Sequence, residues 1–113
     1  MIALARELPI AEPVTRYAAR VVLNTHPDHP TAPREVKQFV RHGASPRGLQ
    51  TLVLAGKIRA LLEGRFNVAF EDVREVAPPA LRHRVITSYE GEAEGVTTDH
   101  LVQLAIAATP EPA

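Results

Sequence analysis

One arginine at the start of a long apolar segment is the residue of this sequence best placed to do chemistry. Arg47 follows Ser45 and Pro46, which are typical of the N-cap and the first position of a helix. Arg47 then lies in the first helical turn, where the helix dipole disfavours a cation by about 0.3–1 kcal/mol. The same turn attracts anions, and a guanidinium beside it completes an anion site. Two interpretations are open: Arg47 contacts a phosphate from outside this chain, or it is a surface arginine paired with a neighbouring carboxylate.

A histidine-containing turn is the nearest approach to a metal site. His26, Asp28 and His29 lie in a segment rich in proline, and their spacing matches no strong metal-binding motif. We therefore expect a solvated turn and no metal site. The sequence also has no cysteine and no glycine-rich phosphate loop. It therefore lacks thiol chemistry, and it lacks a phosphate cradle of its own.

Two charged clusters have no assigned chemistry. Arg82–Arg84 is a compact basic cluster after two prolines. It either caps the C-terminus of a helix, where cations are favoured, or contacts a neighbouring subunit. Glutamates alternate with other residues from Glu90 to Glu94, and carboxylates do acid–base work only where a cleft shifts a pKa. We expect a solvated acidic arm there, which could also serve as a partner surface for a basic patch.

Composition narrows the class of protein. The 113 residues are 45% hydrophobic but only 4% aromatic, so the core of a single domain must consist of Leu, Val, Ile and Ala, which favours helices over a sheet. Thirteen basic and thirteen acidic residues cancel, so a whole-domain charge for nucleic acid is absent. No segment has the length of a membrane span or the pattern of a signal peptide, and we expect a cytoplasmic protein.

The elements that must position these residues follow from hydrophobic spacing and from the prolines and glycines. Apolar residues recur at helical intervals, and the strict alternation of strands is missing. This pattern predicts an all-α bundle of four to five helices with at most one short β pair, followed by a disordered tail at 109–113. Pro78 and Pro79 should break or restart their helix. The expected helices cover 13–26, 45–63, 70–77 and 97–108, with a helical turn or extended segment at 34–44, a brief strand at Val68, and a loop or arm at 86–96.

The long helix that begins after Ser45 and ends before Gly64 is apolar on two nearly opposite sides. Leu52 belongs to one side and Ile58 to the other. Because a helix that is apolar on both sides packs on both sides, we expect it to be the central helix of the bundle.

Several motifs give the sequence a resemblance to a known family. The segments "GASPRG", "FEDVREVAPPALRHR" and "EAEGVT", with the long helix between the first two, all begin within the stretch 40–96, and the last of them ends at Thr97. This stretch resembles the C-terminal lid subdomain of MoxR-type AAA+ ATPases, and the preceding "LPIAEPVTRYAARVVLNT" is similar to the first lid helix of that family. The resemblance covers roughly residues 8–104 in order.

The resemblance implies a role for Arg47 and a location for the missing parts. Arg47 corresponds to the sensor 2 arginine, which leans from the lid onto the γ-phosphate of ATP, with Ser45 and Pro46 completing the nucleotide-binding turn. ATP and Mg²⁺ would be held by an α/β core that this chain does not contain. Residues 1–8 would be the remnant of the link to that core. The chain alone is then expected to hold no cofactor, to bind no ATP tightly and to hydrolyse none, whereas the parent protein would be an ATP hydrolase.

The resemblance also implies partners. They are the AAA+ core of the same protein, neighbouring subunits of a ring homo-oligomer, expected to be a hexamer, and protein clients with von Willebrand factor A-type proteins among them. The parent would couple ATP hydrolysis to chaperone-like remodelling or maturation of protein complexes.

Two other functions fit the residues. The chain could be a stand-alone helical interaction module, in which Arg47 and Arg82–Arg84 are docking charges and no nucleotide is involved. It could also be a DNA-binding helical domain that uses the basic segment from Arg34 to Arg47, although the zero net charge counts against that function.

Overall fold

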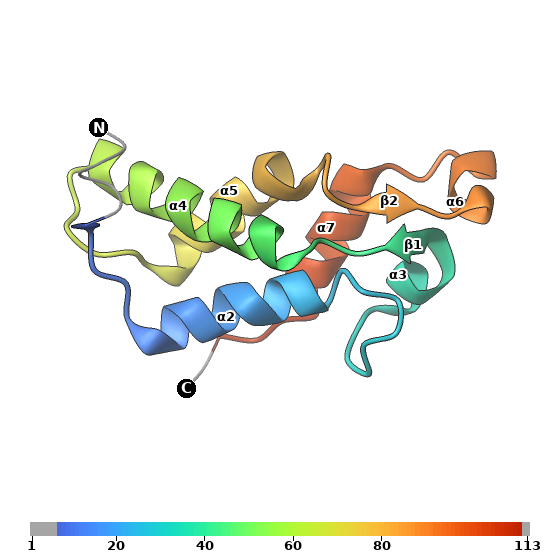
Figure 1. Ribbon diagram of the computed structural model, residues 1–113, viewed down its shortest axis with the longest axis horizontal. Coiled ribbons are helices and arrows are strands. Elements are labelled where there is room, and N and C mark those ends of the chain that lie inside the picture. The colour runs from blue at the N-terminus through green and yellow to red at the C-terminus, as the bar shows by residue number, and fades with distance from the viewer. Residues whose placement is uncertain (1–6, 112–113) are drawn as a thin grey trace.

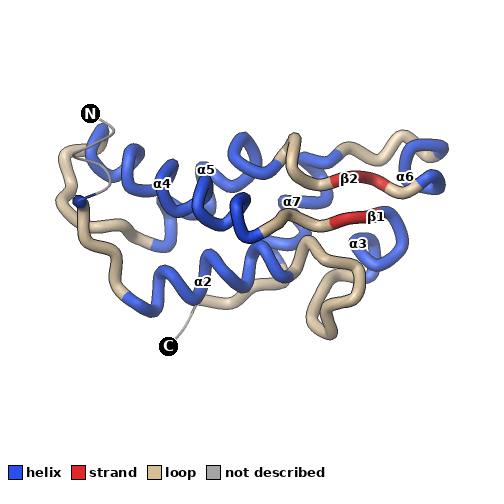
Figure 2. Tube along the Cα trace, viewed as in Figure 1, coloured by secondary structure: helices blue, strands red, loops and turns tan. Residues whose placement is uncertain are grey.

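A computed structural model describes residues 7–111 of the chain, and within them the fold is an all-α bundle with one two-stranded sheet. The expected architecture is confirmed, with six helices in this range in place of four to five. Figures 1 and 2 show the elements along the long axis of the molecule. In chain order they are α2 (Glu12–Leu23), α3 (Arg34–Phe39), β1 (Val40–His42), α4 (Pro46–Leu62), α5 (Phe70–Leu81), β2 (Ile86–Thr87), α6 (Tyr89–Ala93) and α7 (Thr98–Ala107).

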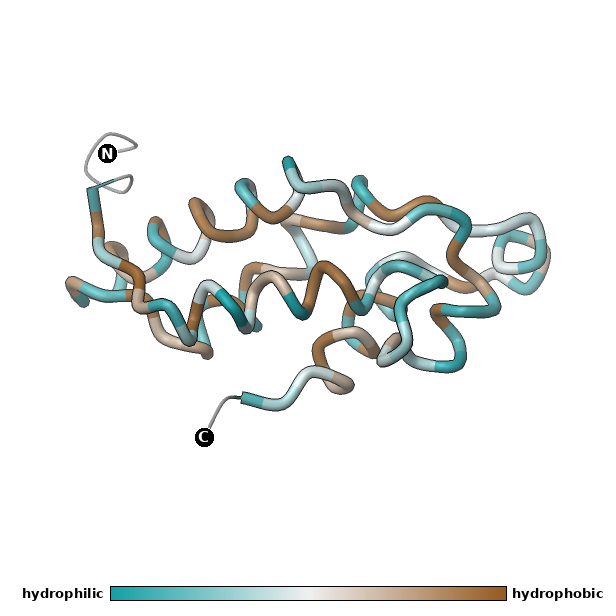
Figure 3. Tube along the Cα trace, turned by 60° about the horizontal axis from the view of Figure 1, so that its bottom comes forward, coloured by the Kyte–Doolittle hydropathy of each residue, from teal (hydrophilic) through white to brown (hydrophobic). Residues whose placement is uncertain are grey.

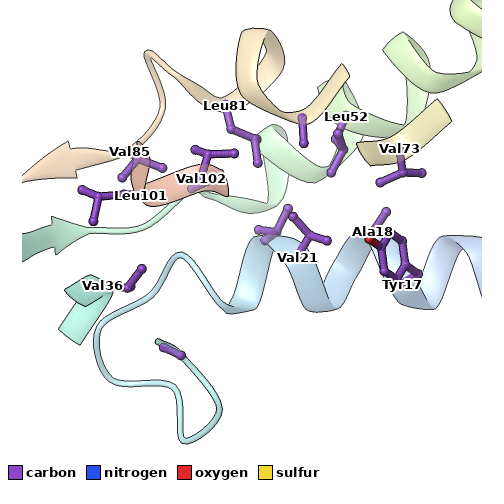
Figure 4. Packing of buried hydrophobic residues seen from close by; sticks show 14 of the residues in the cluster. Tyr17, Ala18, Val21, Val36, Leu52, Val73, Leu81, Val85, Leu101 and Val102 are labelled. Atoms are coloured by element: carbon purple, nitrogen blue, oxygen red, sulfur yellow. The ribbon is translucent and has the colours of Figure 1, made fainter. Parts of the chain in front are cut away.

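The core lies between α2, α4, α5 and α7. Tyr17 and Val21 of α2 face Leu52 of α4, Val73 of α5 and Val102 of α7 (Figure 4), and each of these side chains is almost completely buried. Hydrophobic and hydrophilic residues alternate along the helices (Figure 3), as expected for helices with one side in a core. The core therefore holds the middle turns of α4, between the turn at its start and the loop at its end.

Helix α2 confirms its predicted apolar stripe, but it covers Glu12–Leu23 and so ends three residues before the predicted limit at residue 26. The buried residues are Val14, Tyr17, Ala18, Val21 and Val22. A proline occupies the first turn of α2, and the helix ends at Leu23, before Pro27. The chain then makes a series of turns across the end of the bundle before α3 begins.

Helix α4 has the predicted ends but not the predicted central place. Its buried positions are Gly48, Leu52, Gly56 and Ala60, and this single stripe of mostly small residues allows α5 to pack closely along it. The second apolar side is only partly covered, and its last residue, Leu62, is 68% exposed. The prediction of a helix packed on both sides was therefore wrong. Helix α4 packs against α5 and α2 and leaves its other side partly open, so it lies at the edge of the bundle.

The two ends of α4 differ in how they are capped. At the C-terminus Gly64 has a φ of 76°, and its N–H donates to the Leu61 carbonyl while the next N–H donates to the Ala60 carbonyl. These bonds form a Schellman motif, which requires the left-handed residue that glycine supplies. At the N-terminus Ser45 is the N-cap residue as predicted, but its side chain accepts no hydrogen bond.

The proline pair does not break helix α5. Pro78 and Pro79 lie inside the helix, which continues to Leu81. The missing N–H groups weaken the last turns, but Ala77 and Leu81 on either side are fully buried, and their packing holds the chain helical. The expected break was therefore wrong.

The expected strand at Val68 and the expected arm at 86–96 are also corrected. Residues 65–69 form no strand, and the sheet instead pairs β1 with β2 in antiparallel orientation. Helix α6 follows β2 directly. Gly91 permits α6 to pack closely against the end of α3, because a Cβ atom at Gly91 would lie 2.8 Å from the Phe39 carbonyl oxygen.

The end of the chain is ordered further than predicted. Thr109 is buried; its hydroxyl donates to the Ala105 carbonyl at 2.7 Å and accepts from the Asn24 side chain at 2.7 Å. Thr109, predicted to begin a disordered tail, is therefore part of the packed structure. At the other end Leu8, assigned to a linker remnant, belongs to the core. Residues 1–6 and 112–113 lie outside the described range.

Between residues 7 and 111, no helix is both long and apolar enough to cross a membrane.

A buried carboxylate ties the end of α4 to the start of α5. Asp72 is fully buried and accepts hydrogen bonds from Arg59 at 2.6 Å, from Arg65 through both of its terminal nitrogens, and from the Ala69 N–H at 2.8 Å. Burial by itself raises the pKa of Asp72, but the hydrogen bonds from Arg65, Ala69 and Arg59 outweigh burial and lower the pKa below its ordinary value. Asp72 is therefore ionised in the native state, and its charge stabilises the fold.

Replacing this carboxylate should give a pH-dependent loss of stability. Asp72→Asn should lower the free energy of unfolding by about 2 kcal/mol at pH 7, since hydrogen bonds to a charged group are lost. A lowered native pKa adds stability above the unfolded pKa of about 3.9 and loses it as pH falls through the native pKa. The gap between wild type and variant, measured by urea unfolding, should therefore shrink toward pH 3. A gap that does not change with pH would contradict this assignment. Asp99→Asn, which breaks the half-exposed pair with Arg82, is the matched control and should cost under about 1 kcal/mol.

Candidate functional site

Arg47 lies on the surface at the first turn of the 17-residue helix α4. Its side chain is exposed, and no carboxylate between residues 7 and 111 forms an ion pair with it. The first turn of α4 contains no acidic residue. Of the two interpretations drawn from the sequence, a surface arginine paired with a carboxylate of this chain therefore has no support in the described residues.

The backbone of the same turn is also open to an anion. The first N–H groups of an α-helix have no intrahelical acceptor, and the Ser45 side chain does not fill that role here. Pro46 has no N–H group to donate. The turn formed by Ser45, Pro46 and Arg47 thus combines free N–H groups, the positive end of the dipole and a guanidinium, which is the arrangement that binds a phosphate.

A second arginine lies beside this turn. A Cβ atom added at Gly48 would lie 3.6 Å from Cδ of Arg84 and 3.5 Å from Cδ2 of Leu81. Arg84 is exposed, and within the described part of the chain no carboxylate forms an ion pair with it. Arg84 thus adds a second positive charge, without an ion pair among the described residues, near the positive end of α4.

The predicted basic cluster is thereby divided into two parts. Arg82 donates from Nε to Asp99 at 2.9 Å and joins the end of α5 to the first turn of α7. Arg84 turns instead toward the start of α4. The sequence left open whether this cluster caps a helix or contacts another subunit. The described residues show an ion pair within the chain for Arg82 and a place beside Gly48 for Arg84.

The loop after α2 contacts the segment just before Arg47. The Thr25 hydroxyl accepts a hydrogen bond from the Ala44 N–H at 3.0 Å and donates to the Val22 carbonyl at 2.6 Å. Nε2 of His26 lies 2.6 Å from the Ala44 carbonyl oxygen. The sequence interpretation missed these contacts, because 18 and 19 residues separate the partners and no periodic spacing marks them.

The other candidate groups do not assemble into a site. His26 faces a backbone carbonyl, and His29 lies next to the Thr31 hydroxyl, 3.0 Å from it. Within residues 7–111 no group of histidine and acidic side chains could hold a metal ion. The glutamates from Glu90 to Glu94 are exposed on and just after the short helix α6, and Glu90 accepts from Gln38 at 2.9 Å.

An open apolar groove runs between α2 and α4. Its volume is about 420 Å³, and its lining is formed by Thr15, Leu49, Gln50, Val53, Leu54 and Lys57. The lining contains one charged residue, so the groove is a surface for apolar contact rather than for phosphate.

Comparisons with known proteins agree on one family. A profile of the AAA lid domain matches residues 33–105. Chaperone MoxR1 of Mycobacterium tuberculosis is 35% identical over 86 residues, which cover 76% of this chain and 23% of that protein. Protein MoxR of Paracoccus denitrificans is 41% identical over 81 residues, or 70% of this chain and 24% of that protein. This chain thus spans about a quarter of the length of these curated relatives.

A solved structure has the same fold. The crystal structure of a candidate ATPase from Cytophaga hutchinsonii superposes with a TM-score of 0.91 at 27% identity, over 98% of this chain and 34% of that chain. The similarity therefore covers almost every element described above, including the turn that carries Arg47.

Proposed function

This chain belongs to the AAA lid domain family, and we propose that it is the lid of a MoxR-type AAA+ ATPase, which covers ATP held by the core of the same protein. The family match and the MoxR relatives confirm the resemblance drawn from the motifs. In the proposal Arg47 binds the γ-phosphate as the sensor 2 residue, and Ser45 and Pro46 shape the turn that presents it.

One observation carries the proposal: Arg47 is exposed and without an ion-pair partner among residues 7–111, at the open N-terminus of a long helix. A cation in that position is unfavourable for the isolated chain, so its presence is best explained by a ligand anion. Arg84 supports the same conclusion, because it adds a second unpaired positive charge beside Gly48.

The geometry suggests how the lid responds to the nucleotide. ATP and ADP differ by the phosphate that a guanidinium on the lid would contact, so the two nucleotides would stabilise different angles of the lid. Helix α4 links this contact to the core of the bundle through Leu52 and its buried neighbours. A change at Arg47 would therefore move the bundle as a rigid body, because the packed core does not deform continuously.

The activity belongs to the whole protein. Hydrolysis requires the core, with its ATP and Mg²⁺, and this chain spans about a quarter of its curated relatives. The name Chaperone MoxR1 supports a chaperone-like role, in which ATP hydrolysis drives the remodelling or maturation of protein complexes. We extend the proposal to a ring homo-oligomer, with a hexamer as the expected form, and to protein clients with von Willebrand factor A-type proteins among them.

Hydrogen–deuterium exchange of the full-length protein tests the nucleotide contact. A non-hydrolysable ATP analogue should slow exchange in residues 43–50 more than ADP does, because the phosphate accepts from the free N–H groups of this turn. Residues 59–66, which begin about 20 Å further along α4, are the internal control and should respond less. Equal exchange at 43–50 with both nucleotides would reject the proposed contact and favour an interaction module without a nucleotide.

A further inference from the structure

We propose that Thr25 and His26 are positioning residues for Arg47: they fix the Ala44 peptide and so set the direction in which the first turn of α4 points. The inference rests on the proposed function, since it assigns these side chains a role only through Arg47. Thr25 and His26 hydrogen-bond to Ala44, so their effect on Arg47 would be indirect.

Thr25 holds the N–H side of the Ala44 residue. The hydroxyl of Thr25 accepts from the Ala44 N–H at 3.0 Å and donates to the Val22 carbonyl at 2.6 Å. Thr25 is 1% exposed, and Ala44 is equally buried. Because the hydroxyl donates its hydrogen to α2 and accepts from the segment before α4, it connects these two elements through one oxygen atom.

His26 holds the carbonyl side of the same residue. Nε2 lies 2.6 Å from the Ala44 carbonyl oxygen, and a carbonyl only accepts, so this nitrogen carries the hydrogen. The His26 ring also packs tightly against Gly43, the residue before Ala44. A Cβ atom at Gly43 would lie 2.7 Å from Cδ2 of His26 and 2.7 Å from the Thr25 carbonyl oxygen. Both hydrogen-bonding groups of Ala44 are thus bound by two consecutive residues of one loop.

This clamp, formed by Thr25 and His26 on Ala44, holds the chain directly before α4, whose own serine cap makes no hydrogen bond. Most helices with serine at the N-cap fix their first turn by a hydrogen bond from that side chain, but Ser45 makes none here. The Ala44 contacts lie directly before the N-cap and three positions before Arg47. The direction of the Arg47 turn is therefore set by the loop after α2, and a small misplacement of such a group lowers the rate of a reaction that depends on its position.

A matched pair of variants in the full-length protein tests the inference. Thr25→Val removes the hydroxyl at nearly constant volume, whereas Thr25→Ser keeps it. Thr25→Val should lower kcat for ATP roughly fivefold, and Thr25→Ser should stay within about twofold of wild type. His26→Phe and His26→Gln form a second pair, in which only glutamine retains a side-chain N–H. This pair decides the matter if Thr25→Val fails to fold.

The same substitutions in an Arg47→Ala background separate positioning from a merely structural role. If Thr25 and His26 act through Arg47, their variants should cause little further loss once the guanidinium is gone. Equal losses in both backgrounds would overturn the inference and leave the proposed role of Arg47 intact, and so would full activity of Thr25→Val and His26→Phe. An Arg47→Ala variant with unchanged turnover would overturn the proposed function, and the clamp would lose its role with it.

Discussion

Arg47→Ala in the full-length protein should lower the rate of ATP hydrolysis about tenfold or more while the fold stays intact. The variant removes the charge that we place against the γ-phosphate, and arginines that stabilise developing charge on a transferred phosphoryl group contribute up to about 10³–10⁵ in rate. A sensor arginine that mainly binds and positions the phosphate contributes less, which sets the lower expectation. The measurement is steady-state ATP turnover of the correctly assembled protein.

The structure supplies controls for this prediction. Arg47 is exposed and pairs with no described carboxylate, so its removal should not destabilise the domain. Loss of a cation from the first turn of a helix should even add a few tenths of a kcal/mol. Arg20→Ala, at an exposed position in the last turn of α2, is the matched surface control and should leave turnover unchanged. An assembled Arg47→Ala protein with wild-type turnover would contradict the sensor role.

Leu52→Ala should cause the largest loss of stability, about 2–5 kcal/mol in the free energy of unfolding. Leu52 is fully buried in the middle of α4 and faces the side chains of α2 and α5 (Figure 4). Its truncation leaves a cavity that the surrounding helices cannot fill without moving. Chemical denaturation of the 113-residue chain measures the loss.

Leu62→Ala is the matched control for this substitution. It removes the same atoms from the same helix at a position that is 68% exposed, and it should cost under about 0.5 kcal/mol. From the sequence alone, Ile58→Ala would also cost about 2–5 kcal/mol, but Ile58 is only half-buried and we now expect a smaller loss. Similar losses for Leu52→Ala and Leu62→Ala would contradict the placement of α4 at the edge of the bundle.

The sequence predicted the helices whose buried side shows as an apolar stripe and whose ends are set by nearby prolines or capping residues. Helix α2 has an apolar stripe and flanking prolines, and Thr97 caps α7 by accepting from the His100 N–H at 3.1 Å. Where the prediction failed, tertiary contacts outweighed local preference. The burial of Leu81 carries α5 through Pro78 and Pro79.

The apolar pattern of α4 shows the limit of periodicity. It marks two sides of the helix correctly but does not say which of them this chain covers. Gly56 and the other small residues of the buried stripe were the signal for close packing against a neighbour. The second side, with the exposed Leu62 at its end, is only partly covered by residues 7–111.

The sequence predicted only the part of the candidate site whose residues are neighbours along the chain. The serine, proline and arginine of the turn are adjacent in sequence, so their place at the start of α4 could be predicted. The approach of Arg84 to Gly48 and the contacts of Thr25 and His26 with Ala44 join segments distant in sequence. They depend on how α2, α4 and α5 pack, which no spacing of residue types encodes.

The central claim is that the Arg47 guanidinium contacts the phosphate by which ATP differs from ADP. It is tested most directly by the dissociation constants of a non-hydrolysable ATP analogue and of ADP for the full-length wild type and for Arg47→Ala. The account predicts that the variant binds the ATP analogue about tenfold more weakly, as expected for a charge-assisted hydrogen bond, and binds ADP with almost unchanged affinity. Equal weakening for both nucleotides, or no weakening for the ATP analogue, would contradict it.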